Sequence, residues 1–388
     1  MAYGKIKADA FIYDNSGTDE EVALSGIPSA SDLNAKAPLA SPDLTGTPTA
    51  PTAAVGTNTT QIATTAFVLA NGSSAYELET EGTKYKIEFI AIGGGGAGGY
   101  TDSGYAGGGG GAGGLAYHNG FMVTDGDAYT VNIGSGALGP ASDSQLVGPG
   151  SNYAPNGGDT EIIGPRLFVQ AYGGGGGAGY NGSYTTGAAG GCGGGSEGHG
   201  PNVYWGGESR ARGASGGTSS LGHPGGGSNN GTDQGDGSTA AGGGGGVGGG
   251  PDAWRSHGGD GTPAFHDWLS ATSTGTAHSI NSNSIRYIGG GGAGGEANST
   301  GGTGGRGGAG NGGNSSGSSG GDATDGTGSG GGGRGRWDQG SGRGGNGGDG
   351  LVIFRYRDSD GQKASGGTVT QSGGYYYHVF TSSNTFTA

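Results

Sequence analysis

Short apolar runs, separated by long stretches almost without side chains, dominate the pattern of this chain. These runs are rich in β-branched or aromatic residues, which is typical of β-strands. They lie at residues 83–92, 121–124, 128–133, 160–163, 166–172, 284–288, 351–357 and 375–380. We therefore expect a mostly β and irregular fold with little α-helix. We also hypothesise that residues 375–388 pair back on residues 83–92 and close the domain.

Three of these runs lead directly into glycine, at residues 93–96, 173–177 and 289–292. The segment IGGGGAGG occurs twice, at 92–99 and at 288–295. A repeated transition from strand to glycine indicates organised structure rather than a random linker. Of the chain's 107 glycines, 95 fall between Gly93 and Gly350, so conventional side-chain cores cannot fill this region. Whatever orders it must act through the backbone amides.

Glycine in the polyproline II conformation offers a way to use those amides. Such a segment has three residues per turn and no internal hydrogen bonds, and without Cβ atoms its neighbours can approach until their amides pair. We therefore predict packed polyglycine helices joined to short strands. A flexible Gly/Ser linker is the simpler alternative. A collagen triple helix is disfavoured because Ser316 breaks the phase of the glycines from 301 to 313 and the chain has only 13 prolines.

The first residues, 1–38, predict a small N-terminal head or attachment segment. Residues 5–14 alternate apolar and polar side chains and predict a strand, residues 15–17 predict a turn, and residues 20–27 predict the return strand. The alternative is a terminus without fixed structure.

Residues 39–75 are rich in Thr, Ala and Pro and predict an extended shaft. Pro42, Pro48 and Pro51 restrict their own backbone and that of the preceding residues to extended conformations. Apolar positions at helical spacing within residues 59–71 predict a short helix at the end of this stretch.

Three stretches carry a resemblance to known families. PLASPDLTGTPTAPTAAVGTNTTQIATTAFV, residues 38–68, resembles a repeat of bacteriophage tail-fibre proteins, and residues 1–17 resemble the starts of fibre proteins from cyanobacterial and marine tailed phages. Residues 83–388, with GGNGGDGLVIFRY at 344–356, resemble the glycine-rich domain of phage adhesins. Residues 76–388 would then form a receptor-binding tip domain.

The resemblance implies a homotrimeric tail-fibre component of the virion. Its N-terminus would contact other tail or baseplate proteins, and its tip would adhere to a bacterial surface receptor, either a glycan or an outer-membrane protein. Adhesins of that kind contact the receptor through loops that join packed polyglycine helices, but they are often separate monomeric tip proteins, whereas this chain carries its own apparent shaft. The alternatives are a structural fibre or spacer without a ligand, and a polysaccharide depolymerase that uses two carboxylates. The depolymerase is disfavoured because no β-helix repeat provides a long groove.

Charge and cysteine content narrow the function classes further. The net charge is −14 and no long run of Lys or Arg occurs, so nucleic acid is not an expected partner. Cys192 is the single cysteine, which excludes an intramolecular disulfide. The first residues lack the apolar region of a signal peptide, and no stretch approaches the length of a membrane span. We expect a protein made in the host cytoplasm without a signal peptide.

The four tryptophans all fall in polar, irregular inserts between glycine runs, at 199–213, 251–269 and 333–345. Loops held by a rigid scaffold often carry recognition, and aromatic rings beside charged and amide groups suit sugars or outer-membrane loops. The candidate receptor-binding residues are Tyr204, Trp205, Arg210, Trp254, His257, His266, Trp268, Arg336, Trp337 and Asp338. We expect Trp205, Trp254 and Trp337 to be exposed. The competing interpretation is that each tryptophan only plugs the edge of a glycine slab.

The sequence predicts no catalytic, cofactor or metal site. Residues 344–351 fit one nonapeptide of the calcium-binding β-roll, but calcium there lies between successive copies and this chain has one. Matches to the dinucleotide-binding glycine motif lack a strand-loop-helix context. His257, His266 and Asp267 lack the spacing of zinc ligands. We therefore expect a binding protein and no enzyme.

Overall fold

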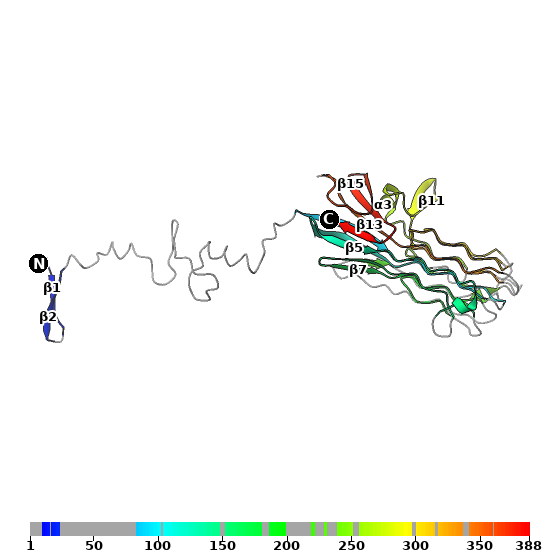
Figure 1. The fold of residues 1–388 in the computed structure, drawn as a ribbon, viewed down its shortest axis with the longest axis horizontal. Helices are drawn as coiled ribbons and strands as arrows, with labels where there is room; N and C mark the ends of the chain where they lie inside the picture. The colour runs from blue at the N-terminus through cyan, green and yellow to red at the C-terminus, as the bar shows by residue number, and fades with distance from the viewer. Residues whose placement is uncertain are drawn as a thin grey trace, which may run out of the picture. The chain divides into compact units, whose positions relative to one another are not determined.

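The computed structural model divides the chain into two compact units, Met1–Thr80 and Glu81–Ala388 (Figure 1). The described residues are 10–15, 17–23 and 83–388, with gaps at 102–103, 148–151, 181–185, 199–218, 222–228, 231–238, 251–255, 297–299, 315–316, 337–340 and 360. In the first unit, strands β1 (Ala10–Asn15) and β2 (Thr18–Ala23) form an antiparallel hairpin, which confirms the predicted strand pair. The predicted shaft and its short helix lie outside the described residues.

The second unit consists of short strands, one six-residue α-helix among its described residues, and glycine segments. Its elements are β3 (Lys84–Ile92), β4 (Leu115–Thr124), β5 (Ala128–Asn132), η2 (Asp143–Gln145), β6 (Thr160–Gly164), β7 (Leu167–Ala171), β8 (Ser219–Leu221), β9 (Asn229–Asn230), β10 (Thr239–Ala240), α3 (His266–Ala271), β11 (Thr276–Ile280), β12 (Asn283–Tyr287), β13 (Leu351–Arg357), β14 (Thr368–Ser372), β15 (Tyr375–Phe380) and β16 (Asn384–Thr387). Each apolar run of the sequence coincides with a strand or part of one. The predicted mostly β fold with little helix is confirmed.

Two antiparallel sheets pack against each other at one end of the second unit. The larger has the strand order β14-β15-β13-β3-β4-β8, and the smaller has the order β16-β5-β6-β7. The hypothesis that the C-terminal residues pair with β3 is wrong, because β13 and β4 occupy both edges of β3. Instead β15 pairs with β13, and β16 pairs with β5. The C-terminus therefore completes both sheets.

The two faces of β3 and β13 contribute to two different cores, as the alternation of side chains along a strand requires. One face packs against the smaller sheet, and its core includes Ile87, Phe89, Phe354 and Phe386. The other face packs against the region of α3, and its core includes Ile90, Ile92, Ile353, Trp268 and Leu269. The strand end of the unit thus has a conventional side-chain core.

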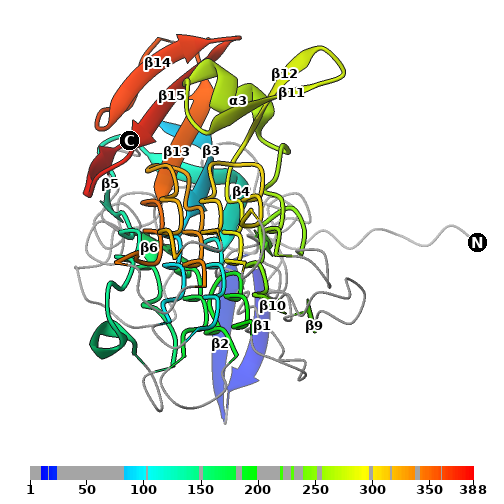
Figure 2. The same cartoon turned by 90° about the vertical axis from the view of Figure 1, so that its right-hand side faces the viewer.

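Beyond the strands, the chain continues into glycine-rich segments that form what we call the glycine slab (Figure 1). Most of its residues lie in neither a helix nor a strand. Figure 2, which looks along the glycine segments, shows these segments stacked in rows. The slab consists of residues 93–101, 106–114, 134–140, 154–158, 173–180, 187–198, 241–248, 256–262, 289–296, 301–313, 317–336 and 342–350.

Backbone hydrogen bonds join each segment of the slab to its neighbours with a period of three residues. In segment 93–101, every third N–H group donates to the same neighbour. The N–H groups of Gly93, Gly96 and Gly99 donate to segment 106–114. Those of Gly94 and Ala97 donate to segment 154–158, and those of Gly95 and Gly98 donate to segment 342–350. Carbonyl groups of the same segment accept N–H groups from 134–140, 173–180 and 317–336. Within the described residues, this segment therefore bonds to six others.

The close approach of these segments leaves no room for side chains between them. A methyl group added at Gly95 would overlap the carbonyl oxygen of Ser329, and one added at Gly98 would overlap that of Gly332. Alanines do occur where a Cβ has space, as at Ala97, which contacts Ala137 and Ala154 in a small apolar cluster. The interior of the slab is thus made of backbone.

A buried histidine fixes the loop between β13 and β14. The hydroxyl of Tyr356 accepts the N–H groups of Lys363 and Ala364 at 3.1 and 3.0 Å, so it is free to donate its proton to Nε2 of His378 at 3.2 Å. Nδ1 of His378 then donates to the carbonyl of Gly366 at 2.8 Å. Burial lowers the pKa of His378, and the bond to Gly366 offsets this only in part, so the ring is neutral at pH 7.

Candidate functional site

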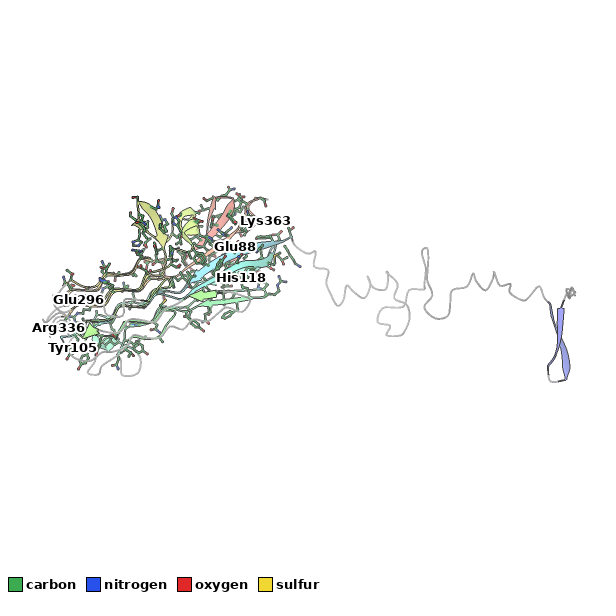
Figure 3. The ribbon with its side chains drawn as sticks, turned by 180° about the vertical axis from the view of Figure 1, so that it is seen from behind. Glu88, Tyr105, His118, Glu296, Arg336 and Lys363 are labelled. Carbon is green, nitrogen blue, oxygen red and sulfur yellow. The ribbon has the colours of Figure 1, made fainter. Side chains whose placement is uncertain are left out.

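The slab has a strand end and an opposite end, which we call the distal end. Figure 3 labels Tyr105, Glu296 and Arg336 at the distal end, and Glu88, His118 and Lys363 at the strand end. Each of the inserts that carry the predicted tryptophans has at least one end at the distal end, after Gly198, before Ser256 or after Arg336. The chain that follows the first insert continues to β8, which pairs with β4 at the strand end. The distal end is therefore the candidate site for recognition.

Aromatic side chains are prominent among the described residues of the distal end. The rings of Tyr105 and Tyr180 meet edge to face with centroids 4.7 Å apart. Thr101 bridges to Tyr180 as a parallel pair, and its hydroxyl donates to the carbonyl of Tyr105 at 2.5 Å. These contacts fasten the end of one glycine segment to the end of another.

A buried cation also lies near this end. The guanidinium of Arg334 is 4.8 Å from the ring centroid of Tyr100, within the range of a cation–π contact. Arg334 is only 1% exposed, and Glu197 is fully buried. Both residues belong to the ends of glycine segments, so ionisable side chains take over the packing where the glycine runs stop.

Polar contacts secure the positions from which the inserts leave. The hydroxyl of Ser256 donates to Oε1 of Glu296 at 2.5 Å, and the backbone N–H of Arg336 donates to the carbonyl of Glu296 at 3.2 Å. The backbone N–H of Thr303 donates to Nδ1 of His257 at 2.9 Å. Glu296 therefore lies between two of the three points at which the tryptophan inserts begin or end.

The structure separates the predicted site residues that it describes. Arg336 lies at the distal end (Figure 3), and His257 directly follows Ser256, which bonds to Glu296 there. His266 and Trp268 belong to α3, which lies beside the strands (Figure 1). Nδ1 of His266 accepts the backbone N–H of Arg286 at 3.0 Å. The remaining candidates lie outside the described residues: Tyr204, Trp205, Arg210, Trp254, Trp337 and Asp338.

Trp268 requires a correction, because it is not a surface residue. Its side chain is 5% exposed and packs edge to face against Phe265 and Tyr377, with centroids 5.8 and 6.3 Å apart. The last residue of its insert, Leu269, is fully buried beside it. The α3 helix turns both side chains into the core at the strand end, so Trp268 is a packing residue and presents no exposed ring to a receptor.

The tyrosines of the distal end were missed by the sequence analysis, although a signal for them exists. Tyr100 directly follows IGGGGAGG, and Tyr180 directly follows GGGGGAG. An aromatic residue at the same offset after two glycine runs indicates that both residues occupy equivalent structural positions. Both tyrosines lie where their glycine segment reaches the distal end of the slab.

The described residues contain no cluster of three or more His, Cys, Asp or Glu side chains that could hold a metal ion. Within the same residues, no helix has the length and apolar character to cross a membrane.

A family model for a glycine-rich domain matches residues 69–357, about three quarters of the chain. The chain belongs to this family. The matched region of the glycine-rich domain contains the slab and ends at Arg357, the last residue of β13. Strands β14, β15 and β16, which complete the two sheets, lie after it.

A second match concerns a phage protein. Over 37 residues, the chain is 76% identical to the probable tail fiber protein of Escherichia phage P2. This match covers 10% of the chain and 6% of that protein. The glycine-rich domain protein is thus similar in part to a phage tail fibre.

Proposed function

We propose that this chain is a tail-fibre component of a phage virion that adheres to the bacterial host through loops at the distal end of its slab. The observation that carries the proposal is the arrangement of that end. The inserts with Trp254 and Trp337 meet the slab at Ser256 and Arg336, which both bond to Glu296, and the insert with Trp205 begins after Gly198, which bonds to Ala106. The partial similarity to a tail fiber protein supports the location in the tail.

We further infer that the glycine segments are polyglycine helices with three residues per turn. The three-residue period of the hydrogen bonds supports this, because residues one turn apart in such a helix face the same neighbour. A slab of this kind would be a rigid support, since every segment is bonded on several sides. Rigid supports lower the entropy lost when attached loops bind a ligand.

The proposed partners follow from this role. The N-terminal unit would attach the chain to other tail or baseplate proteins, and three chains would form one fibre. Several tips on one virion would then raise weak contacts with a glycan or an outer-membrane protein to firm attachment through effective concentration. The rival function is a structural spacer without a ligand.

Binding of the labelled full-length chain to intact cells of candidate hosts tests the proposal. We expect saturable binding, and we expect the triple variant Trp205→Ala/Trp254→Ala/Trp337→Ala to bind about tenfold or more weakly, because buried aromatic contacts dominate binding energies. A matched control is the triple variant Met122→Ala/Val369→Ala/Phe168→Ala, which truncates exposed apolar side chains on strands.

Both triple variants must first show the circular dichroism and unfolding midpoint of the parent chain. Equal binding by the two variants would remove the tryptophan inserts as the receptor site. Absence of binding to every host that the phage infects would favour the spacer.

A further inference from the structure

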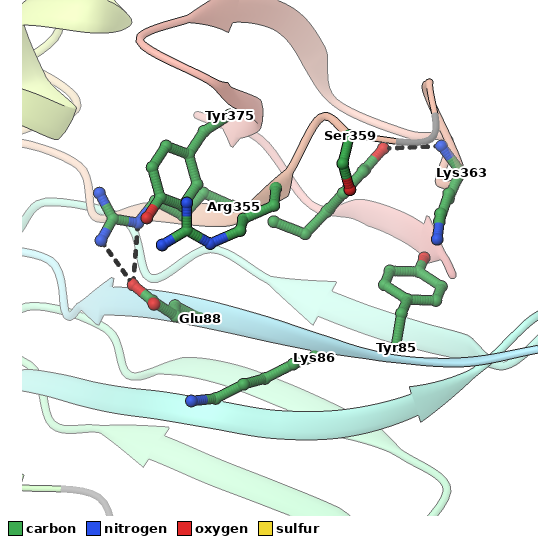
Figure 4. A pocket seen from close by; sticks show the side chains of 9 residues that line it. Tyr85, Lys86, Glu88, Arg355, Ser359, Lys363 and Tyr375 are labelled. Atoms are coloured by element: carbon green, nitrogen blue, oxygen red, sulfur yellow. Dashed lines mark hydrogen bonds and ion pairs between the residues drawn. The ribbon is translucent and has the colours of Figure 1, made fainter.

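A pocket of about 280 Å³ lies at the strand end, where Figure 3 labels two of its residues, Glu88 and Lys363, and Figure 4 shows it from close by. Three strands and one loop build it. The residues that define its chemistry are Tyr85, Lys86 and Glu88 of β3, Arg355 and Arg357 of β13, Lys363 of the loop after β13, and Tyr375 of β15.

The pocket is cationic although the chain has a net charge of −14. Its lining contains one carboxylate, that of Glu88, and four cationic side chains, those of Lys86, Arg355, Arg357 and Lys363. Oε2 of Glu88 accepts two hydrogen bonds from Arg355, at 2.8 and 2.6 Å. Burial alone would lower the pKa of Arg355, but these bonds and the charge of Glu88 raise it overall. No carboxylate among the described residues pairs with Lys86 or Arg357.

The aromatic rings of the pocket already hold cationic groups. The guanidinium carbons of Arg355 and Arg357 are 4.3 and 5.3 Å from the ring centroid of Tyr375. The ammonium of Lys363 is 5.3 Å from the ring centroid of Tyr85. Such contacts fix the position of a cation without neutralising it. The pocket therefore offers positive charge to a ligand more than it offers aromatic surface.

Among the described residues, Glu88 supplies the one carboxylate that lines the pocket, while the charges of Asp125 and Asp127 act on Tyr85 from nearby. Asp358, the residue after β13, accepts a hydrogen bond from Nε2 of Gln371 at 2.8 Å and is thereby engaged with β14. Burial, and then the charges of Tyr356 and Asp125, raise the pKa of Tyr85, so its hydroxyl stays neutral. A second hollow, beyond Arg355, is lined by Asp267 and contains no other cation. Asp267 therefore lines the second hollow and is not among the residues that line the first pocket.

We propose that this pocket binds a phosphate group, either inorganic phosphate or the phosphate monoester of a saccharide. Once Glu88 is paired with Arg355, the positive charges of Lys86 and Arg357 remain in addition to that of Lys363, which lies over the ring of Tyr85. A phosphate monoester carries −1.5 to −2 charges at pH 7 and offsets more of this excess than a single carboxylate does. Guanidinium groups also match the geometry of phosphate oxygens. The volume suffices for a phosphate with one sugar ring.

The site does not follow from membership of the glycine-rich family. The family match ends at Arg357, whereas Lys363 and Tyr375 come from the later loop and from β15. It would also bind its ligand whether or not the distal loops bind a host receptor, so failure of one proposal leaves the other standing.

Ligand-observed NMR with the full-length chain at low ionic strength tests the site. The probes are inorganic phosphate, glucose 6-phosphate, glucuronate and glucose. We expect saturable binding of the two phosphates and none of glucose. Arg357→Gln and Lys86→Gln should each weaken phosphate binding at least about fivefold, because each removes an exposed positive charge from a residue that lines the pocket. The matched control is Arg306→Gln, whose side chain is 47% exposed and lies 3.7 Å from Asp260 in the slab.

Each outcome decides the proposal. Glucose 6-phosphate binding more tightly than inorganic phosphate would assign the site to a phosphorylated saccharide, and equal binding would assign it to the phosphate group itself. Tighter binding of glucuronate than of either phosphate would overturn the proposal. The same conclusion follows if no probe binds, or if the two pocket variants bind as the control does. Neither pocket residue packs in a core, so all three variants should keep the parent unfolding midpoint.

Discussion

Replacing Gly110 with alanine is expected to destabilise the second unit by about 3 kcal/mol or more, at the upper end of what overpacking costs. The added methyl group would overlap the carbonyl oxygen of Gly96 and would lie 2.8 Å from that of Ala97. Both obstacles are backbone, so no side-chain rotation relieves the clash. Shifting the segment would break the bond from the Gly110 N–H to Gly331 and the bond that its carbonyl accepts from Gly292. Thermal unfolding followed by circular dichroism measures the effect.

The matched control for this variant is Gly249→Ala. Gly249 is partly exposed, and a methyl group there would meet no atom within 4 Å. Its change in stability should therefore stay within about 0.5 kcal/mol. Equal unfolding midpoints for the two alanine variants would contradict a slab whose interior excludes side chains.

Replacing Phe386 with alanine is expected to cost about 3–5 kcal/mol, as for other fully buried phenylalanines. Phe386 belongs to β16, which pairs with β5 of the smaller sheet. Its ring stacks on that of Phe354 in the larger sheet, with centroids 4.2 Å apart, and meets His378 edge to face. The substitution would leave a cavity between the two sheets near the end of the chain. Urea denaturation gives the loss of unfolding free energy.

Phe168→Ala serves as the control for this prediction. Phe168 lies on β7 of the same sheet as Phe386, but its side chain is 48% exposed. It should therefore lose less than about 1 kcal/mol. If Phe386→Ala unfolded at the same urea concentration as this control, the C-terminal strand would not be part of the core.

The strands with continuous apolar or aromatic runs could be predicted from the sequence, and two of them, β13 and β15, have the predicted bounds. Strands β14 and β16 could not be predicted, because TVTQS and NTFT are mostly polar and bury little besides Phe386. The helix α3 is only six residues long, too short for a periodic pattern. Strand partners were also misjudged, since a pattern shows which face is apolar but not which edge is free.

The order of the glycine segments is beyond sequence reasoning for a different reason. One glycine run has the same backbone groups as any other, so any two runs could pair. What distinguishes them is the strand from which each begins, as with β3 before Gly93 and β12 before Gly289. The candidate site residues could not be sorted from the sequence for a similar reason, because Trp268 and the other tryptophans lie in polar inserts of similar composition. Only the fold shows that α3 turns Trp268 into the core.

The central claim is that hydrogen bonds between glycine segments form the core of the slab and hold its distal end in place. Amide hydrogen exchange of the full-length chain, resolved by residue, tests this most directly. The account predicts that Gly96, Gly111 and Gly331 exchange within roughly tenfold of the amides in β3 and β13, because all would open only when the unit unfolds. Exchange of these glycines at the rate of an unstructured chain, while the strands stay protected, would contradict it.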